Sequence, residues 1–100
     1  MNRYTVFVTP DAWVEMKELP GYLRQRVRRA IKDLAEEPRP GSSKQLTLAE
    51  VERELRRLRL DKWRIVYAIT DDDCAVDVLA VRKRPPYDYG DLTTLLQNIG

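Results

Sequence analysis

Basic residues are concentrated in residues 53–70, written RELRRLRLDKWRIVYAIT. From position 57 to position 60, basic and apolar residues alternate, the pattern of a strand with one wet and one dry face. A hairpin here buries Leu58 and Leu60, holds Arg57 and Arg59 together on the other face, and brings Arg64 in from the second strand. Like charges on paired strands repel one another. The pattern therefore favours an anion as the partner of this face.

The chain contains no histidine. This excludes a Ser-His-Asp or Cys-His catalytic site and any zinc site that uses imidazole. If the protein is an enzyme, proton transfer must use Asp, Glu, Lys, Arg, Tyr or the substrate itself. The acids gather at 71–73 and 77, apart from the bases, so a metal-dependent nuclease is disfavoured and no cofactor is expected.

Length and composition predict one domain over residues 1–100. The hydrophobic fraction of 43% and charged fraction of 34% are typical of a soluble globular protein. We expect a cytoplasmic protein without a membrane segment, because no long apolar run or signal peptide is present. The single cysteine, Cys74, follows three aspartates, which disfavours a nucleophilic role because nearby carboxylates raise a thiol pKa.

The formal net charge is only +2 and does not by itself indicate nucleic-acid binding. The bases are nevertheless segregated from the acids, at 24–32, 53–64 and 82–84. Segregation of this kind produces local positive potential without an extreme isoelectric point. For Arg24, Arg28 and Lys32, spaced four residues apart, a solvated helix face is favoured over an RNA-contacting stripe.

The N-terminal part reads as a strand followed by two helices. Residues 4–9 (YTVFVT) are β-branched and aromatic, as in a strand. Apolar residues at helical spacing predict helices over about 11–19 and 22–36, interrupted by Pro20-Gly21. The stretch 38–43 (PRPGSS) is a loop by composition. Residues 44–52 are ambiguous, and a short helical or irregular segment is expected there.

The C-terminal part reads as a strand meander followed by a helix. Strands are expected at 57–60 and 63–69, an acidic turn at 71–74, and a mostly buried central strand at 75–82. After an irregular tail, Asp91 is a candidate N-cap for a last short helix. The predicted fold is α+β, with two N-terminal helices packed on an antiparallel sheet of three to four strands and a short C-terminal helix.

The chain resembles the RelE/ParE superfamily of bacterial toxins, and the RelE-like branch in particular. The resemblance covers nearly the whole chain: the opening strand YTVFVT, the helical pair joined by Leu19-Pro20, the stretch LRRLRLDKWRIVYAI, and VDVLAVRKR with the tyrosines that follow it. It implies a type II toxin held inactive by a cognate antitoxin protein. In the RelE branch, the implied activity is endonucleolytic cleavage of mRNA in the ribosomal A site, with inhibition of translation.

Carried over residue by residue, the resemblance implies five functional residues. They are Arg57, Arg59, Arg64, Arg84 and Tyr87. Tyr89 competes with Tyr87 for the tyrosine role, because Pro85-Pro86 changes the spacing. The strand bases of RelE itself are lysines, whereas this chain has arginines there.

RNA cleavage needs neither histidine nor a metal, because the substrate supplies its own nucleophile. The 2′-hydroxyl attacks the adjacent phosphate, and the protein orients the attack and stabilises the developing charge. Arginine suits this task because its planar fork binds phosphate through two hydrogen bonds and stays charged. A tyrosine could act as general base if its pKa were depressed, or stack on a base, and Glu52 and Glu54 are weaker base candidates.

Several readings remain open from the sequence. Arg57 and Arg59 also fit ordinary solvated strand positions, and Trp63 and Tyr67 fit core packing better than base stacking. The alternative function is a ParE-like, non-enzymatic inhibitor of DNA gyrase, or an inactive member that only binds its antitoxin. The antitoxin is expected on exposed leucines of the tail (Leu92, Leu95, Leu96) or on the outside of the helical pair, although those leucines also fit a role in the core.

Overall fold

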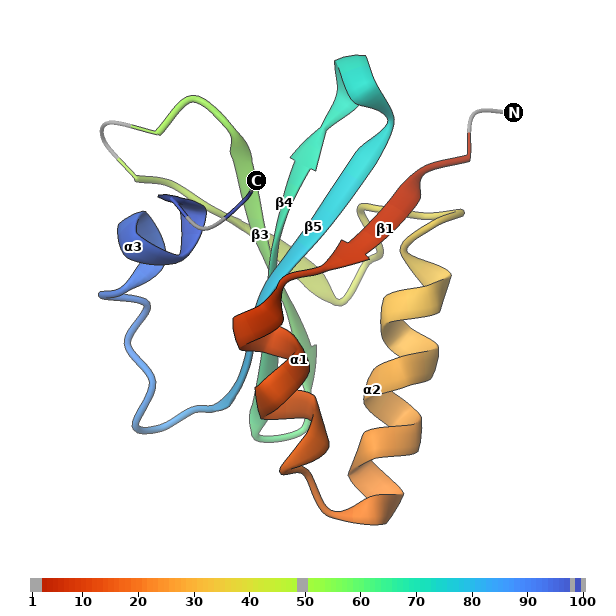
Figure 1. Ribbon diagram of the computed structural model, residues 1–100, viewed down its shortest axis with the longest axis vertical. Coiled ribbons are helices and arrows are strands. Elements are labelled where there is room, and N and C mark those ends of the chain that lie inside the picture. The colour runs from red at the N-terminus through yellow and green to blue at the C-terminus, as the bar shows by residue number, and fades with distance from the viewer. Residues whose placement is uncertain (1–2, 49–50, 98, 100) are drawn as a thin grey trace.

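The computed structural model describes residues 3–48, 51–97 and 99, and shows a sheet with helices on both faces (Figure 1). The strands are β1 (Thr5–Val8), β2 (Ser43–Leu46), β3 (Glu54–Leu60), β4 (Trp63–Thr70) and β5 (Ala75–Lys83). The α-helices are α1 (Pro10–Lys17), α2 (Gly21–Asp33) and α3 (Leu92–Gln97), and a 3₁₀ turn, η1 (Asp71–Asp73), joins β4 to β5. The predicted α+β class and helix placement are confirmed.

The sheet has the strand order β1-β5-β4-β3-β2. Strands β3 to β5 form the predicted antiparallel meander, and β2 adds an antiparallel edge strand that was not predicted. Strand β1 pairs with β5 in parallel, so the sheet is mixed and five-stranded instead of antiparallel with three to four strands. A parallel pair needs a crossover connection. Helices α1 and α2 and the strands after them supply it.

The segment that the sequence left ambiguous begins with a strand. Residues 43–46 pair with β3 as the edge strand β2, instead of forming a short helical or irregular segment throughout. Leu48, Val51, Leu55 and Leu58 fall at helical spacing in the sequence, which favoured a helix here. Leu55 and Leu58, however, lie in β3 and face opposite sides of the sheet.

Two apolar clusters lie on the two faces of the sheet. On one face, α1 and α2 pack against the sheet through Met16, Val27, Ile31 and their neighbours. On the other face, α3 packs through Leu92 and Leu95. Within the part of the chain that the structure describes, no helix is both long enough and apolar enough to cross a membrane.

The N-terminus of α1 is capped in the usual way. Thr9 has extended backbone angles and its hydroxyl accepts a hydrogen bond from the Ala12 N–H, while Pro10 occupies the first helical turn. A cap of this kind satisfies a helix N–H that has no partner within the helix. It fixes α1 directly after β1, so that α1 runs beside β5, where β1 has ended.

Candidate functional site: an arginine row across the sheet

Three arginines stand side by side on adjacent strands. Arg59 of β3 is the direct partner of Arg64 of β4, and Arg64 is in turn the partner of Arg82 of β5. Directly opposite side chains of a sheet lie on the same face. These three residues, named here the arginine row, therefore project from the α3 side of the sheet, opposite α1 and α2.

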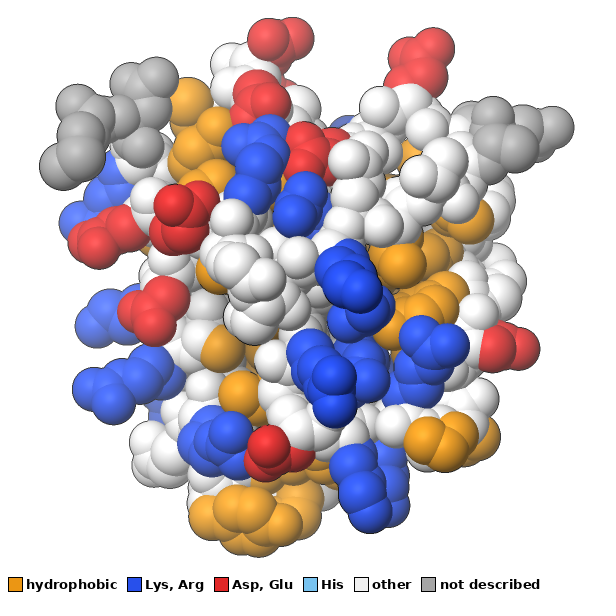
Figure 2. Space-filling view, turned by 180° about the vertical axis from the view of Figure 1, so that it is seen from behind, with side chains coloured by type: hydrophobic (Ala, Val, Ile, Leu, Met, Phe, Trp, Pro, Cys, Tyr) orange, Lys and Arg blue, Asp and Glu red, His pale blue; other side chains and the backbone are white. Residues whose placement is uncertain are grey.

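The other predicted basic residues flank this row. Arg57 lies two positions before Arg59 on the same face, opposite Lys44 of β2. Arg84 lies two positions after Arg82, and its N–H donates to the Lys62 carbonyl at 2.7 Å, which continues the strand pairing past β5. Figure 2 shows Lys and Arg side chains gathered near the middle of the molecule as seen from behind, beside a hydrophobic area. The structure thus brings the four predicted arginines to one region.

The sheet separates arginines with carboxylate partners from arginines without them. At one end of the sheet, Arg39 binds Glu54 and Asp71, and Arg56 binds Glu54. At the other end, Arg57, Arg59 and Arg64 form no ion pair with any carboxylate in the described ranges. Phosphate binding needs uncompensated positive charge, which only the second group supplies.

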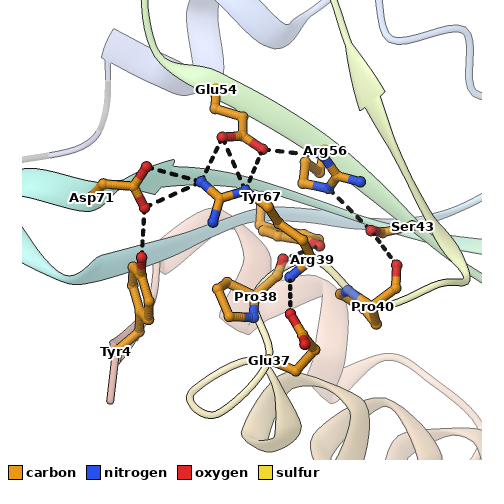
Figure 3. Close-up of polar contacts among 10 residues, drawn as sticks. All are labelled: Tyr4, Glu37, Pro38, Arg39, Pro40, Ser43, Glu54, Arg56, Tyr67 and Asp71. Carbon is orange, nitrogen blue, oxygen red and sulfur yellow. Dashed lines mark hydrogen bonds and ion pairs between the residues drawn. The ribbon is translucent and has the colours of Figure 1, made fainter. Parts of the chain in front are cut away.

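At the end of the sheet where Arg39 and Arg56 form ion pairs, side-chain contacts fix the loop before β2 to the sheet (Figure 3). Arg39 donates three hydrogen bonds to Glu54 and two to Asp71, and the Tyr4 hydroxyl also donates to Asp71, at 2.5 Å. The hydroxyl of the buried Tyr67 donates to the Pro38 carbonyl at 2.8 Å. These contacts are structural. They set the position of β2 and β3, which in turn present Arg57 and Arg59.

Arg64 is held against the tip of the β3–β4 hairpin. Its Nη1 donates to the carbonyl oxygens of Asp61 and Trp63, both at 2.9 Å. Its Nε is buried and has no hydrogen-bond partner in the described chain. A buried guanidinium nitrogen without a partner is costly, so the described chain does not fully satisfy the Arg64 guanidinium.

Arg82, in contrast, is held from two sides. It donates to Glu15 of α1 and to Asp91 at the start of the C-terminal helical segment, and its guanidinium lies 4.9 Å from the Tyr87 ring centre. Burial opposes its charged form, but the hydrogen bonds that Arg82 donates to Glu15 and Asp91 outweigh burial and raise the Arg82 pKa. Glu15 also accepts the Val81 N–H at 2.9 Å, an edge donor that β1 leaves unpaired.

The two tyrosines of the tail have different surroundings. The half-buried Tyr87 donates its hydroxyl to Asp91 at 2.8 Å, and burial, followed by this hydrogen bond, raises the Tyr87 pKa well above its usual range. Tyr89 accepts a long hydrogen bond from Arg84 at 3.4 Å, and the Arg84 guanidinium lies 5.1 Å from its ring centre. A tyrosine with a raised pKa stays protonated at neutral pH, so Tyr87 is not arranged as a general base.

Of the two weaker base candidates, Glu54 is also poorly placed. Glu54 is occupied by Arg39 and Arg56, and the Arg39 hydrogen bond lowers its pKa. Glu54 begins β3, whereas Arg59 lies near the end of the same strand. The geometry therefore supports charge stabilisation by arginines more directly than proton transfer. No cluster of three or more His, Cys, Asp or Glu side chains suited to a metal occurs among the residues described.

Sequence reasoning missed Arg82 and its partners Glu15 and Asp91. Side chains alternate between the two faces of a strand, and this alternation could have pointed to Arg82, because Arg82 and Arg84 share a strand face just as Arg57 and Arg59 do. The pairing of Arg82 with Arg64, however, depends on a register shift next to Val66 and Tyr67. No sequence pattern indicates that α1 and the tail supply its carboxylates.

Comparison with solved structures shows where this fold occurs. The chain is similar to RelE of the archaeal RelE–RelB complex of Pyrococcus horikoshii, with a TM-score of 0.74 and 22% identity over 87% of this chain and 100% of that one. It is similar to the toxin–antitoxin complex RelBE2 of Mycobacterium tuberculosis, with a TM-score of 0.70 and 28% identity over 82% of this chain and 99% of that one. Isolated RelE of E. coli gives a TM-score of 0.67 and 19% identity over 97% and 99%.

Comparison at the level of sequence families gives the membership. Among curated proteins, no sequence matches this chain. Residues 6–85 match the family model described as the ParE toxin of the type II toxin–antitoxin system parDE. That match includes the first strand, both N-terminal helices, the meander and the arginine row. The predicted resemblance is confirmed, with structural neighbours that are RelE-like: this chain is a toxin of the type II toxin–antitoxin class and belongs to the ParE toxin family of the RelE/ParE superfamily.

Proposed function

We propose that this toxin is an endoribonuclease that cleaves mRNA on the ribosome. The observation that carries the proposal is the group of Arg57, Arg59 and Arg64, which share one sheet face and form no ion pair in the described chain. A fold holds unpaired like charges together at a cost. A phosphate backbone offsets that cost, and planar guanidinium groups bind it through paired hydrogen bonds.

In the proposed reaction, the 2′-oxygen of the substrate attacks the adjacent phosphorus. The bond from phosphorus to the 5′-oxygen breaks, which gives a 2′,3′-cyclic phosphate and a 5′-hydroxyl. Arg64, Arg59 and Arg57 bind the non-bridging oxygens, where charge develops. The proton of the 2′-hydroxyl passes to water, and water protonates the leaving oxygen. Arg84 extends the anion site past β5, and the protonated Tyr87 positions Arg82 through Asp91.

The second candidate function is non-enzymatic inhibition of DNA gyrase. The match to the ParE family model favours it, as does the poor placement of the predicted general bases. In this alternative the arginine row recognises its target without chemistry. Cleavage products distinguish the two functions, because only the nuclease yields new 5′ ends.

The partner in either case is proposed to be a cognate antitoxin. The similar P. horikoshii and M. tuberculosis structures are toxin–antitoxin complexes. In this chain, Leu92 and Leu95 are buried against the sheet, so the expectation that the tail leucines form an exposed docking surface is wrong for these two. Large exposed hydrophobic side chains lie instead on β1, α1 and α2. They are Phe7, Trp13, Val14 and Tyr22.

Primer extension on mRNA in translating ribosomes tests the proposal, with gyrase supercoiling measured in parallel. We expect new mRNA 5′ ends that require both toxin and ribosomes, and unchanged supercoiling. Arg64→Ala should lower the cleavage rate about 100-fold, the usual effect of losing one donor to developing charge. Arg29→Ala, on the exposed face of α2, is the control and should cleave normally. Blocked supercoiling without cleavage would establish the gyrase alternative instead.

A further inference from the structure

A cleft adjoins the arginine row and has no assigned role. Its volume is about 580 Å³, within the range of ligand-binding clefts. It lies between the end of α1, the paired ends of β4 and β5, and the segment 86–91. Arg82 lines both the cleft and the row. A chain bound by its phosphate on the row therefore has a neighbouring group within reach of the cleft.

The cleft is lined by two aromatic rings. Trp63 packs partly against the cluster under α1 and α2 and also lines the cleft. Tyr87 lines the cleft from the tail, with its ring fixed by Arg82 and by an edge contact to Tyr89 at 4.9 Å. Rings held in place by such contacts provide flat surfaces on which a nucleobase stacks.

The polar groups of the cleft leave one carboxylate without a partner. Glu15 and Asp91 are occupied by Arg82, and Asp88 accepts the Gly90 N–H. Glu18, at the C-terminal cap of α1, makes no side-chain hydrogen bond or ion pair in the described chain. Glu18 therefore offers the cleft a carboxylate with no partner in the described chain, and a carboxylate binds a donor and repels a carbonyl oxygen.

We propose that this cleft binds a nucleobase that carries an exocyclic amino group, and that Glu18 is the residue that discriminates against uracil. Adenine, cytosine and guanine each present an amino group to a carboxylate. Uracil presents one N–H flanked by two carbonyl oxygens, which the carboxylate repels. Lys83, the cross-strand partner of Trp63, lies beside the ring as a second polar contact. The inference rests on the proposed action on RNA and adds a base preference to it.

Fluorescence of Trp63 gives a direct test. The chain has two tryptophans, and Trp13 lies on α1 outside this cleft, so Trp13→Phe leaves Trp63 as the only tryptophan. The probes are 2′-O-methyl trinucleotides of C, U and A, which lack the attacking hydroxyl and stay intact. C against U is the decisive pair, because the two pyrimidines have nearly the same shape. We expect CCC to quench Trp63 and to bind about 10-fold more tightly than UUU, as one hydrogen bond to a charged group would give.

Glu18→Gln should reduce the ratio of CCC to UUU affinity to about 2-fold, because an amide both donates and accepts. Asp33→Asn, at the end of α2 and outside this cleft, is the control for loss of a carboxylate and should keep the full ratio. Equal affinity and equal quenching for CCC and UUU would overturn the base cleft. The RNA proposal would survive that result if Arg64→Ala still weakened binding of both. Quenching of Trp63 by tri-arginine and by none of the nucleotides would also overturn the base cleft, and would assign the cleft to a basic protein segment.

Discussion

At the scale of the residue, the role of an arginine here depends on whether a carboxylate lies within reach. Arg39 and Arg82 each contact two carboxylates and hold elements together. Arg57, Arg59 and Arg64 contact none in the described chain, although the same sheet carries them. Sequence alone does not separate these groups, because the carboxylates come from distant segments. The contrast is the reason for assigning stability to the first group and phosphate binding to the second.

The Arg39 contacts predict a pH-dependent loss of stability. Arg39→Ala should lower the free energy of unfolding by about 1–2 kcal/mol at pH 7, between the value of an exposed ion pair and that of a hydrogen bond to a charged group. The Arg39 hydrogen bond lowers the Glu54 pKa below its ordinary 4.5. The stabilisation is therefore complete above about pH 4.5 and is lost as the pH falls through the lowered folded-state pKa.

Urea unfolding of the wild type and of Arg39→Ala at pH 7 and pH 2 measures this effect. The difference between the two proteins should be largest at pH 7 and shrink at pH 2. Arg29→Ala, which removes an exposed arginine without an ion-pair partner among the described residues, should match the wild type at both values. An Arg39→Ala effect that is equally large at pH 2 would show that packing of the side chain, and not its charge, is responsible.

Asp77 is predicted to act in the opposite sense. It lies on β5 opposite Phe7 and Ala68, its side chain is only 13% exposed, and Arg53 is 3.9 Å away. Burial raises its pKa above the ordinary 3.8, and the charge of Arg53 only partly opposes this. The ionised carboxylate therefore costs stability as the pH rises from about 3.8 through the folded-state pKa, and the cost is complete above it.

Asp77→Asn removes this cost and should raise the free energy of unfolding at pH 7 by about 0.5–2 kcal/mol, the usual gain from relieving an unfavourable charge. At pH 3 or below, both proteins are neutral at this position and should unfold alike. Thermal unfolding followed by circular dichroism at the two pH values measures the difference. A less stable Asp77→Asn at pH 7 would mean that the pairing with Arg53 outweighs desolvation.

At the scale of the element, α3 covers the same sheet face that carries the arginines. Leu92 is 1% exposed and packs in the cluster with Leu55, Val66 and Leu79. Leu92→Ala should lower the free energy of unfolding by about 2–3 kcal/mol, the lower part of the range for buried leucine, because a short helix near the chain end can shift into the cavity. Thr93→Ala, at the next and exposed position, should change it little. Chemical denaturation of both variants is the measurement, and equal small effects would place α3 off the sheet in solution.

The elements that periodicity marks strongly could be predicted from the sequence. The period of two in residues 57–60 and the helical spacing in 22–36 are uninterrupted, and both produced the observed element. The edge strand β2 could not be predicted, because Ser-Lys-Gln-Leu has little β preference and is held by pairing with β3. Local sequence patterns also could not identify the parallel partner of β1, because the paired residues, such as Thr5 and Ala75, are 70 positions apart in the chain.

The candidate site was predictable to the extent that it follows strand alternation. Arg57 and Arg59 share a face by spacing alone, and the hairpin brings Arg64 opposite Arg59 because only Asp61 and Lys62 separate β3 from β4. Arg82 joins them across a register shift, and Glu15 reaches it from α1. These contacts depend on tertiary packing, and no window of the sequence contains both partners.

At the scale of the whole molecule, charge is distributed between two basic surfaces separated by the sheet. The arginine row lies on the α3 side, and α2 carries a second basic surface on the other side, with a hollow lined by Arg26, Arg28, Arg29 and Lys32. The small net charge of +2 gives no indication of either surface, because acidic residues elsewhere balance their charge. The proposed function uses the first surface, and for the second the prediction of a solvated helix face stands. Salt dependence of RNA binding separates their contributions, because each phosphate contact releases condensed counterions.

The salt dependence of RNA binding should reveal how many phosphates the arginines contact. For a single-stranded RNA, the logarithm of the affinity should fall linearly with the logarithm of salt concentration, with a slope of about −0.7 for each phosphate contact. The double variant Arg57→Ala/Arg59→Ala should make the slope less steep by about 1.4 if both residues contact phosphate. The matched double variant Arg28→Ala/Arg29→Ala on α2 removes the same charge and should leave the slope unchanged. Fluorescence anisotropy of a labelled 2′-O-methyl oligonucleotide at several salt concentrations measures both. Equal changes in the two variants would mean that RNA responds to net charge alone, and a change confined to the α2 variant would move the phosphate contacts to the opposite side of the sheet.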